Sequence, residues 1–123
     1  MVLFILTSLP SPDYIPTFEL GDKFEHFFAY CGLSVLLFFA LNFQGKYTKL
    51  RAKSVNFTII ICSFYGLFDE LHQIPIPGRT FDLLDLLANV IGITLGVTIG
   101  YLFFKYLLKQ GDENISKTGT SLH

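Results

Sequence analysis

The chain has 123 residues, 51% of them hydrophobic and 15% charged, with a formal net charge of -1 and a mean hydropathy of +0.51. Soluble domains of this length are less apolar, so the composition excludes an ordinary water-soluble domain. It favours a single small membrane protein, and we expect no nucleic-acid partner.

The first ten residues, MVLFILTSLP, are apolar but too few to cross a bilayer. They lack the basic segment and the small-residue cleavage site of a signal peptide. They predict a short or truncated first helix, and a start codon assigned too late would leave the same sequence. The proline-rich segment 10–21 that follows predicts a linker along the membrane surface.

Three long apolar runs follow, and they predict three membrane-spanning helices. A helix from Phe24 to Phe43 is about 30 Å long, which matches the hydrocarbon core of a bilayer. The run 83–107 is long enough to cross with some tilt. The run 55–68 is shorter, and its helix spans the bilayer only if it continues through Asp69, Glu70 and Gln73.

These elements predict an all-α fold, a small polytopic membrane helix bundle with three full transmembrane helices and a short N-terminal helix. We assign residues 1–110 to a single transmembrane domain. Residues 111–123 are polar and predict a disordered tail. The sequence has no internal repeat, P-loop or Gly-rich dinucleotide motif, and we expect no cofactor.

The basic residues predict the orientation of the spans. They concentrate between the first two spans and after the third, at Lys46, Lys49, Arg51, Lys53, Lys105 and Lys109. Because lysine and arginine are enriched on the cytoplasmic side, we expect both termini to be cytoplasmic. The opposite ends of the spans, which carry most of the acids, then face outward.

Polar residues at these outward ends recur at helical spacing. Three sets each share one face of a helix: Asp22, His26 and Tyr30; Asp69, Glu70 and Gln73; and Asp82, Asp85 and Asn89. The sequence PIPGR predicts a tight turn at Pro77 and Gly78 that brings Arg79 over them. Since charged side chains facing lipid are costly, we predict that these faces converge on a polar site open to the outside.

Some of these residues also have a purely structural interpretation, because charges can end a helix at the interface and an aspartate at a helix start favours the helix dipole. We prefer this interpretation for Asp13, Glu19, Glu25 and Asp82. We prefer a functional role for Asp69, Glu70, Arg79 and Asp85. His26 fits both roles, His72 is expected at the surface, and Lys23 either reaches the interface or pairs with an acid.

Cysteines and glycines predict packing. Cys31 and Cys62 lie in apolar runs without a CxxC spacing or a histidine cluster, so we expect neither a disulfide nor a zinc site, and we assign no metal. Gly92, Gly96 and Gly100 recur every four residues, a stripe that lets another helix approach closely. That helix belongs to the same chain or to a second copy in a homo-oligomer.

Two segments, DKFEHFFAY and YGLFDELHQIPIPGRTFDLLDLLANVIGITLG, resemble the VanZ-like membrane proteins, and the likeness extends over about Asp22 to Gly100. The first helix is usually a full span in that family and is shorter here. The residues that match the family pattern are Asp22, Lys23, His26, Tyr30, Asp69, Glu70, Gln73, Pro77, Gly78, Arg79, Asp85, Asn89, Gly92 and Gly96.

The resemblance implies a bacterial plasma-membrane protein of a family associated with reduced susceptibility to glycopeptide antibiotics, above all the lipid-tailed teicoplanin type. The expected partner is a membrane lipid or lipid-linked envelope precursor, or the glycopeptide itself. From the residues we favour a binding site in which Arg79, Lys23 and His26 hold the phosphate or carboxylate of an amphiphilic ligand while the acids orient the cations.

Three other mechanisms stay open. The carboxylates would bind Mg²⁺, with His26 or Glu70 as general base, in an enzyme acting on lipid-linked phosphates, although no Asp-rich prenyl-diphosphate motif is present. The acids and His26 would form a proton or ion relay, extended by Thr94 and Thr98, in a small transporter. Alternatively, the charges form an internal network that fixes helix register, and function lies in a partner protein.

Overall fold

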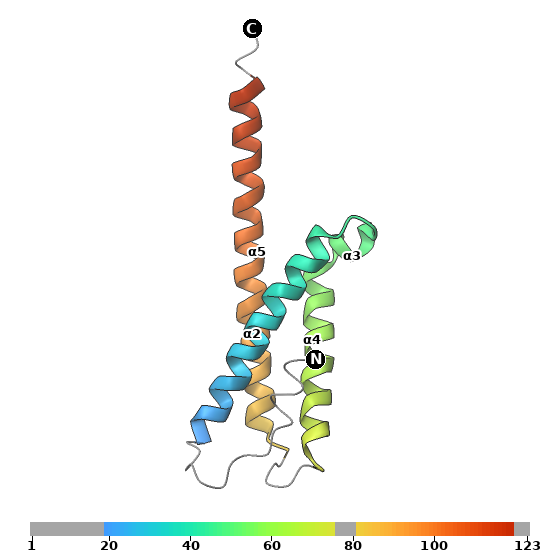
Figure 1. The fold of residues 1–123 in the computed structure, drawn as a ribbon, viewed down its shortest axis with the longest axis vertical. Helices are drawn as coiled ribbons and strands as arrows, with labels where there is room; N and C mark the ends of the chain where they lie inside the picture. The colour runs from blue at the N-terminus through green and yellow to red at the C-terminus, as the bar shows by residue number, and fades with distance from the viewer. Residues whose placement is uncertain (1–18, 76–80, 120–123) are drawn as a thin grey trace.

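A computed structural model describes residues 19–75 and 81–119 of the chain. Within these ranges every regular element is a helix: α2 (Glu19–Phe43), α3 (Thr48–Ala52), α4 (Ser54–Gln73) and α5 (Leu83–Gly119) (Figure 1). Helices α2, α4 and α5 are each long and apolar enough to cross a membrane. The prediction of an all-α bundle with three spans is therefore confirmed, and the predicted N-terminal helix and linker lie mostly outside the described residues.

Helix α4 reaches the length of a bilayer by including its polar end. It ends at Gln73, so Asp69 and Glu70 form part of its last turns, as the length argument predicts. Both acids and Gln73 are buried between helices. Because they face protein and not lipid, the helix continues through them without exposing charge to the hydrocarbon region.

The bundle is polar inside and apolar outside. Side chains that recur every four residues along α2 are buried, among them His26, Ser34 and Asn42, and the buried face of α4 includes Ser54 and Thr58. Large apolar side chains such as Phe28, Phe64 and Leu102 point outward instead. A water-soluble bundle has the opposite pattern, so this arrangement identifies a multi-pass membrane protein.

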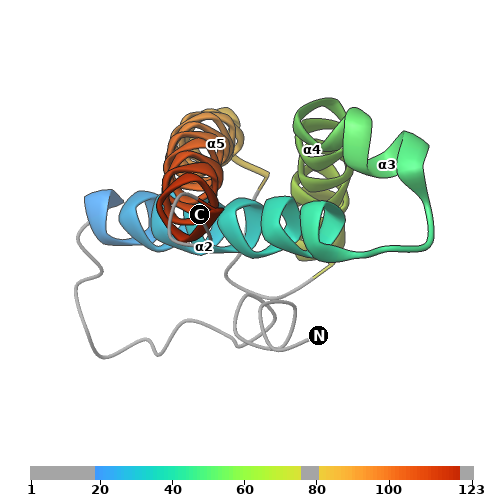
Figure 2. The same cartoon turned by 90° about the horizontal axis from the view of Figure 1, so that it is seen from above.

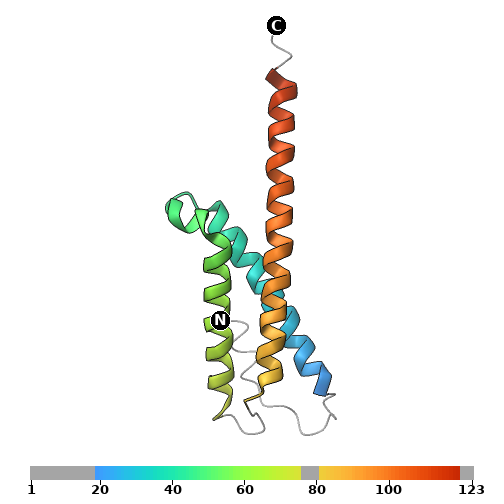
Figure 3. The ribbon, with the colours of Figure 1, turned by 180° about the vertical axis from the view of Figure 1, so that it is seen from behind.

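The three long helices contact one another in pairs, and α2 makes its most extensive contacts with α5. Seen from above, α4 and α5 both lie on the same side of α2 (Figure 2). Helix α2 crosses α5 obliquely, and α4 runs antiparallel to both (Figures 1 and 3). The starts of α2 and α5 and the end of α4 therefore lie at one end of the bundle, and α3, in the basic connection between α2 and α4, lies toward the other.

Glycines make the α2–α5 crossing close. A Cβ atom at Gly92 would overlap the carbonyl oxygen of Phe27, and one at Gly96 would overlap the carbonyl oxygen of Cys31. At Gly100 the nearest atom is a ring carbon of Phe38, 2.9 Å away. The glycine stripe of α5 thus packs against α2 of the same chain, and backbone meets backbone there.

Next to the polar end, an apolar core and contacts between phenylalanine rings hold the helices together. Tyr30, Cys62, Ile93 and Val97 form the buried core, and both cysteines are free. Further along, rings of α2 and α5 pack edge to face, including Phe38 on Phe104 and Phe39 on Phe103. This seam lies between the polar cluster and the lysine-rich end of the bundle.

Helix α5 is longer than the sequence predicts. Its 37 residues correspond to about 55 Å, which exceeds the hydrocarbon thickness, and its C-terminal part extends beyond the other helices (Figure 3). The predicted disordered tail began at residue 111, whereas the helix continues to Gly119. Two local pairs lie on the exposed surface at the start of this extension, Lys109 with Glu113 at 3.8 Å and Gln110 with Tyr106.

Candidate functional site

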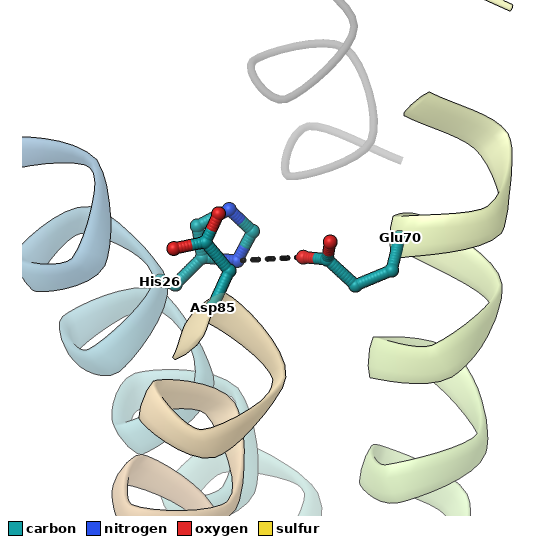
Figure 4. Close-up of side chains that lie close together, drawn as sticks. All are labelled: His26, Glu70 and Asp85. Carbon is teal, nitrogen blue, oxygen red and sulfur yellow. Dashed lines mark ion pairs between the residues drawn. The ribbon is translucent and has the colours of Figure 1, made fainter. Parts of the chain in front are cut away.

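Three buried side chains from three different helices meet at the polar end of the bundle. They are His26 of α2, Glu70 of α4 and Asp85 of α5 (Figure 4). One nitrogen or oxygen atom of each lies within 4.8 Å of the corresponding atoms of the other two. The convergence comes from the antiparallel path of α4, which brings its last turns beside the first turns of α2 and α5.

His26 connects the helices through its ring nitrogen Nδ1. This atom lies 3.0 Å from the side-chain oxygen Oδ1 of Asn89 on α5, and it donates to that oxygen in the tautomer that carries the proton on Nδ1. It also lies 3.7 Å from Oε1 of Glu70 on α4, a separation longer than a hydrogen bond. His26 therefore lies between an amide and a carboxyl group.

Lys23 and Asp82 form the partly exposed rim of the cluster. The lysine Nζ donates to Oδ2 of Asp82 at 2.8 Å and to Oδ1 of Asp85 at 3.1 Å. Asp82 also caps α5, because its Oδ1 accepts the Leu84 N–H at 2.8 Å. The hydrogen bond from Lys23, together with the Leu84 N–H, holds the pKa of Asp82 below its usual value.

Tyr30 and Asp69 lie deeper, one turn further into the bundle. The Tyr30 hydroxyl donates to Oδ2 of Asp69 across 3.4 Å, and both side chains are buried. Gly66 lets α4 approach here, because a Cβ on it would lie 3.3 Å from both the Tyr30 ring and Nδ2 of Asn89. A larger residue at position 66 would push on the cluster directly.

Three buried polar atoms of the cluster have no hydrogen-bond partner within the described chain. They are Oε1 of Glu70, Nε2 of Gln73 and Nδ2 of Asn89. Almost all buried polar groups in proteins are hydrogen-bonded, so orphans grouped in one place call for an explanation. The group includes one acceptor, the Glu70 oxygen, and two N–H donors. A bound polar molecule or ion with matching groups would satisfy them.

The charge of the cluster favours cations. Within the described residues its acids, Asp69, Glu70, Asp82 and Asp85, face Lys23 and the titratable imidazole of His26. Lys23 is already paired with two of these acids. An anionic ligand therefore needs a further positive charge next to the buried carboxyls.

The structure brings most of the residues proposed from the sequence to this one place: Lys23, His26, Tyr30, Asp69, Glu70, Gln73, Asp85 and Asn89. Pro77, Gly78 and Arg79 lie outside the described residues, as does the side chain of Asp22. Lys23 takes the acid-paired arrangement of its two expected alternatives. His72, which was expected at the surface, is partly exposed and stacks on Phe68.

Two residues make contacts that the sequence did not indicate. Asp82, for which a role at the helix end was preferred, does cap α5, and it also binds Lys23. Gly66 was not singled out, although it lies one turn before Glu70. In contrast, Thr94 and Thr98 do not extend the cluster, because both are exposed and donate to carbonyl oxygens of their own helix.

Comparisons with known proteins place the chain in a family. The VanZ/LLP1 family model matches residues 2–105. An uncharacterized protein of the fission yeast Schizosaccharomyces pombe is 30% identical over 92 residues, which are 74% of this chain and 53% of the relative. The chain thus spans about half the length of that curated relative. No solved structure matches the chain. Because the family model covers most of its length, the chain belongs to the VanZ/LLP1 family.

Proposed function

We propose that this protein binds the polar headgroup of a membrane lipid or lipid-linked envelope component at the cluster around His26, Glu70 and Asn89. The observation that carries the proposal is the group of buried orphan atoms, Oε1 of Glu70, Nε2 of Gln73 and Nδ2 of Asn89. A headgroup with hydroxyl and phosphate oxygens would accept from the two amides and donate to the carboxyl group.

The position of the cluster supports a lipid as the ligand. It lies at the ends of all three spans, where headgroups meet the protein, and on the side away from the basic residues of the α2–α4 connection. By the positive-inside rule this is the outer face, and the C-terminal end of α5 then lies on the cytoplasmic side. The side chains of Lys23 and Asp82 at the rim are 23% and 36% exposed, so a headgroup would approach the cluster from this rim.

Lys23 takes a different role from the phosphate-binding one first expected. Lys23 is held by Asp82 and Asp85, so it orients the acids and carries little free charge for a phosphate. Arg79 precedes Asp82 by three residues in the sequence, and we propose it as the cation that binds the phosphate or carboxylate of the ligand.

We further propose that, in a bacterial plasma membrane, this binding reduces susceptibility to teicoplanin-type glycopeptides by handling a lipid-linked precursor. Family membership supports the membrane setting. Because a relative is a fungal protein, we place the lipid part of the ligand ahead of the glycopeptide part.

The antibiotic part of the proposal is tested in a sensitive Gram-positive host that expresses the protein at matched membrane levels. We expect the wild type to raise the inhibitory concentration of teicoplanin more than that of vancomycin. Asn89→Leu removes the buried amide and should abolish the protection. Asn42→Leu, which removes a buried asparagine at the other end of α2, should retain it.

Equal protection by both variants would separate the phenotype from the cluster. If a well-expressed wild type gives no protection, the antibiotic role is refuted. Lipid binding is tested separately, by measuring bound phospholipid directly.

A further inference from the structure

His26, Glu70 and Asp85 form a set of potential metal ligands that no local motif of the sequence marks as one site. Each comes from a different helix, each is at most 3% exposed, and one donor atom of each lies within 4.8 Å of the others. Figure 4 shows both carboxyl groups close to the imidazole ring. The set combines one nitrogen donor with two carboxylates in a buried location.

A second observation points to an ion within this set. Oε1 of Glu70 has no hydrogen-bond partner in the described chain, although Glu70 is fully buried, and this oxygen is directed toward His26 (Figure 4). Its distance of 3.7 Å from Nδ1 of His26 is too long for a hydrogen bond. Two ligands of one ion, each bonded at about 2.1 Å, lie roughly 3 to 3.5 Å apart. A small inward movement therefore lets both atoms bind the same ion.

The neighbours of the set are compatible with an ion. Lys23 bonds only one oxygen of Asp85, and it lies closer to Asp82, so the second oxygen of Asp85 has no hydrogen bond from the lysine. Nδ1 of His26 binds an ion only in the tautomer with its proton on Nε2, in which the bond to Oδ1 of Asn89 at 3.0 Å is given up and that oxygen lies beside the set. A divalent cation here would also offset the excess of carboxyl groups that the described cluster carries.

From this geometry we propose that His26, Glu70 and Asp85 bind one divalent transition-metal ion, with Zn²⁺ the best match. Mg²⁺ and Ca²⁺ prefer sites built from oxygen alone, whereas an imidazole nitrogen favours zinc and related ions. Three protein ligands leave a coordination position open. A small ion also suits a cluster that is almost completely buried.

This inference goes beyond headgroup binding and does not depend on it, because metal binding is measured without lipid. If both hold, the open position of the ion would accept an oxygen of the ligand's phosphate. That contact would explain how an acidic cluster takes an anionic headgroup.

The test uses the full chain in detergent micelles, with any affinity tag removed and metal stripped by EDTA before dialysis. Zn²⁺ is then titrated calorimetrically, and bound metal is measured after gel filtration. We expect about one zinc ion per chain for the wild type and at least about tenfold weaker binding for His26→Asn and Asp85→Asn. His72→Asn removes a histidine of the same helix as Glu70 and should bind zinc like the wild type.

The unfolding temperature provides a second measurement of zinc binding. Zinc that binds the native state raises the unfolding temperature, so saturating zinc should raise it in the wild type and in His72→Asn but not in the ligand variants. Glu70→Gln keeps the shape of its side chain and replaces His26→Asn as the ligand variant if His26→Asn does not fold. Zinc binding that is absent from the wild type, equal in the ligand variants, or surpassed by Mg²⁺ would overturn the proposal.

The metal and lipid proposals fail separately. A wild-type protein that binds zinc but no phospholipid would refute the headgroup role alone. A wild-type protein that binds phospholipid but no zinc would refute the metal site alone.

Discussion

Gly96→Ala should destabilise this protein strongly, although it adds only one methyl group. The new Cβ would overlap the carbonyl oxygen of Cys31 and the hydroxyl of Ser34. The Ser34 side chain can rotate, but the Cys31 carbonyl belongs to the backbone of α2, so the two helices must separate. Overpacking typically costs about 1–3 kcal/mol, and we expect the upper end of that range because the clash involves backbone.

The matched control is Gly32→Ala on the facing helix, where nothing lies within 4 Å of the added Cβ. That variant should be neutral or stabilised by up to about 1 kcal/mol, because alanine has the higher helix propensity. The free energy of unfolding is measured in mixed detergent and SDS micelles. Equal stabilities for the two variants would show that the glycine stripe does not set the α2–α5 distance.

Lys23→Met should also unfold the protein readily, for an electrostatic reason. Without the ammonium group, Asp85 loses its partner at 3.1 Å while its side chain stays only 4% exposed. Glu70 lies close by and offers no positive charge to replace the ammonium group. Removal of one partner from a buried pair typically costs about 3–5 kcal/mol, and we expect about 3 kcal/mol because Lys23 is partly exposed.

The double variant Lys23→Met/Asp85→Asn separates this explanation from a simple loss of packing. The asparagine side chain at position 85 carries no charge, so the double variant should recover most of the stability that the single variant loses. The same unfolding measurement applies to both. A double variant no more stable than Lys23→Met would contradict the ion-pair account and assign the loss to the lysine's aliphatic stem.

The lengths of the apolar runs were sufficient to predict the three spans. The second span needed one further step. Its run 55–68 is too short for a bilayer, so the helix had to include Asp69 and Glu70, as α4 does. The inward direction of these polar faces also followed from spacing, because a charge facing lipid is costly. Length and amphipathic period are local properties, which a sequence displays directly.

Other features depend on contacts between distant residues. Lys23 was left with two alternatives, because its bonds to Asp82 and Asp85 arise only when α2 meets α5. The set of His26, Glu70 and Asp85 has no local motif, and it exists only because α4 runs antiparallel to the other two helices. The end of α5 was predicted as a tail because its composition is polar, whereas pairs such as Lys109 with Glu113 support a helix there.

The central claim is that the orphan polar atoms of the cluster serve a ligand and not the fold. Gln73→Met tests it, because the side chain keeps its approximate length and loses the buried, unbonded Nε2 group. Removal of an unsatisfied buried group relieves about 1–3 kcal/mol of desolvation cost, so the unfolding midpoint should stay equal or rise. The same purified protein is examined by native mass spectrometry for bound phospholipid, with Asn42→Leu as the control.

We expect Gln73→Met to be at least as stable as the wild type and to hold phospholipid about tenfold more weakly, which corresponds to one hydrogen bond to a charged group. Asn42→Leu should retain lipid like the wild type. A Gln73→Met protein that unfolds more easily yet keeps its lipid would show that the cluster is an internal network for helix register, and would contradict the proposed binding site.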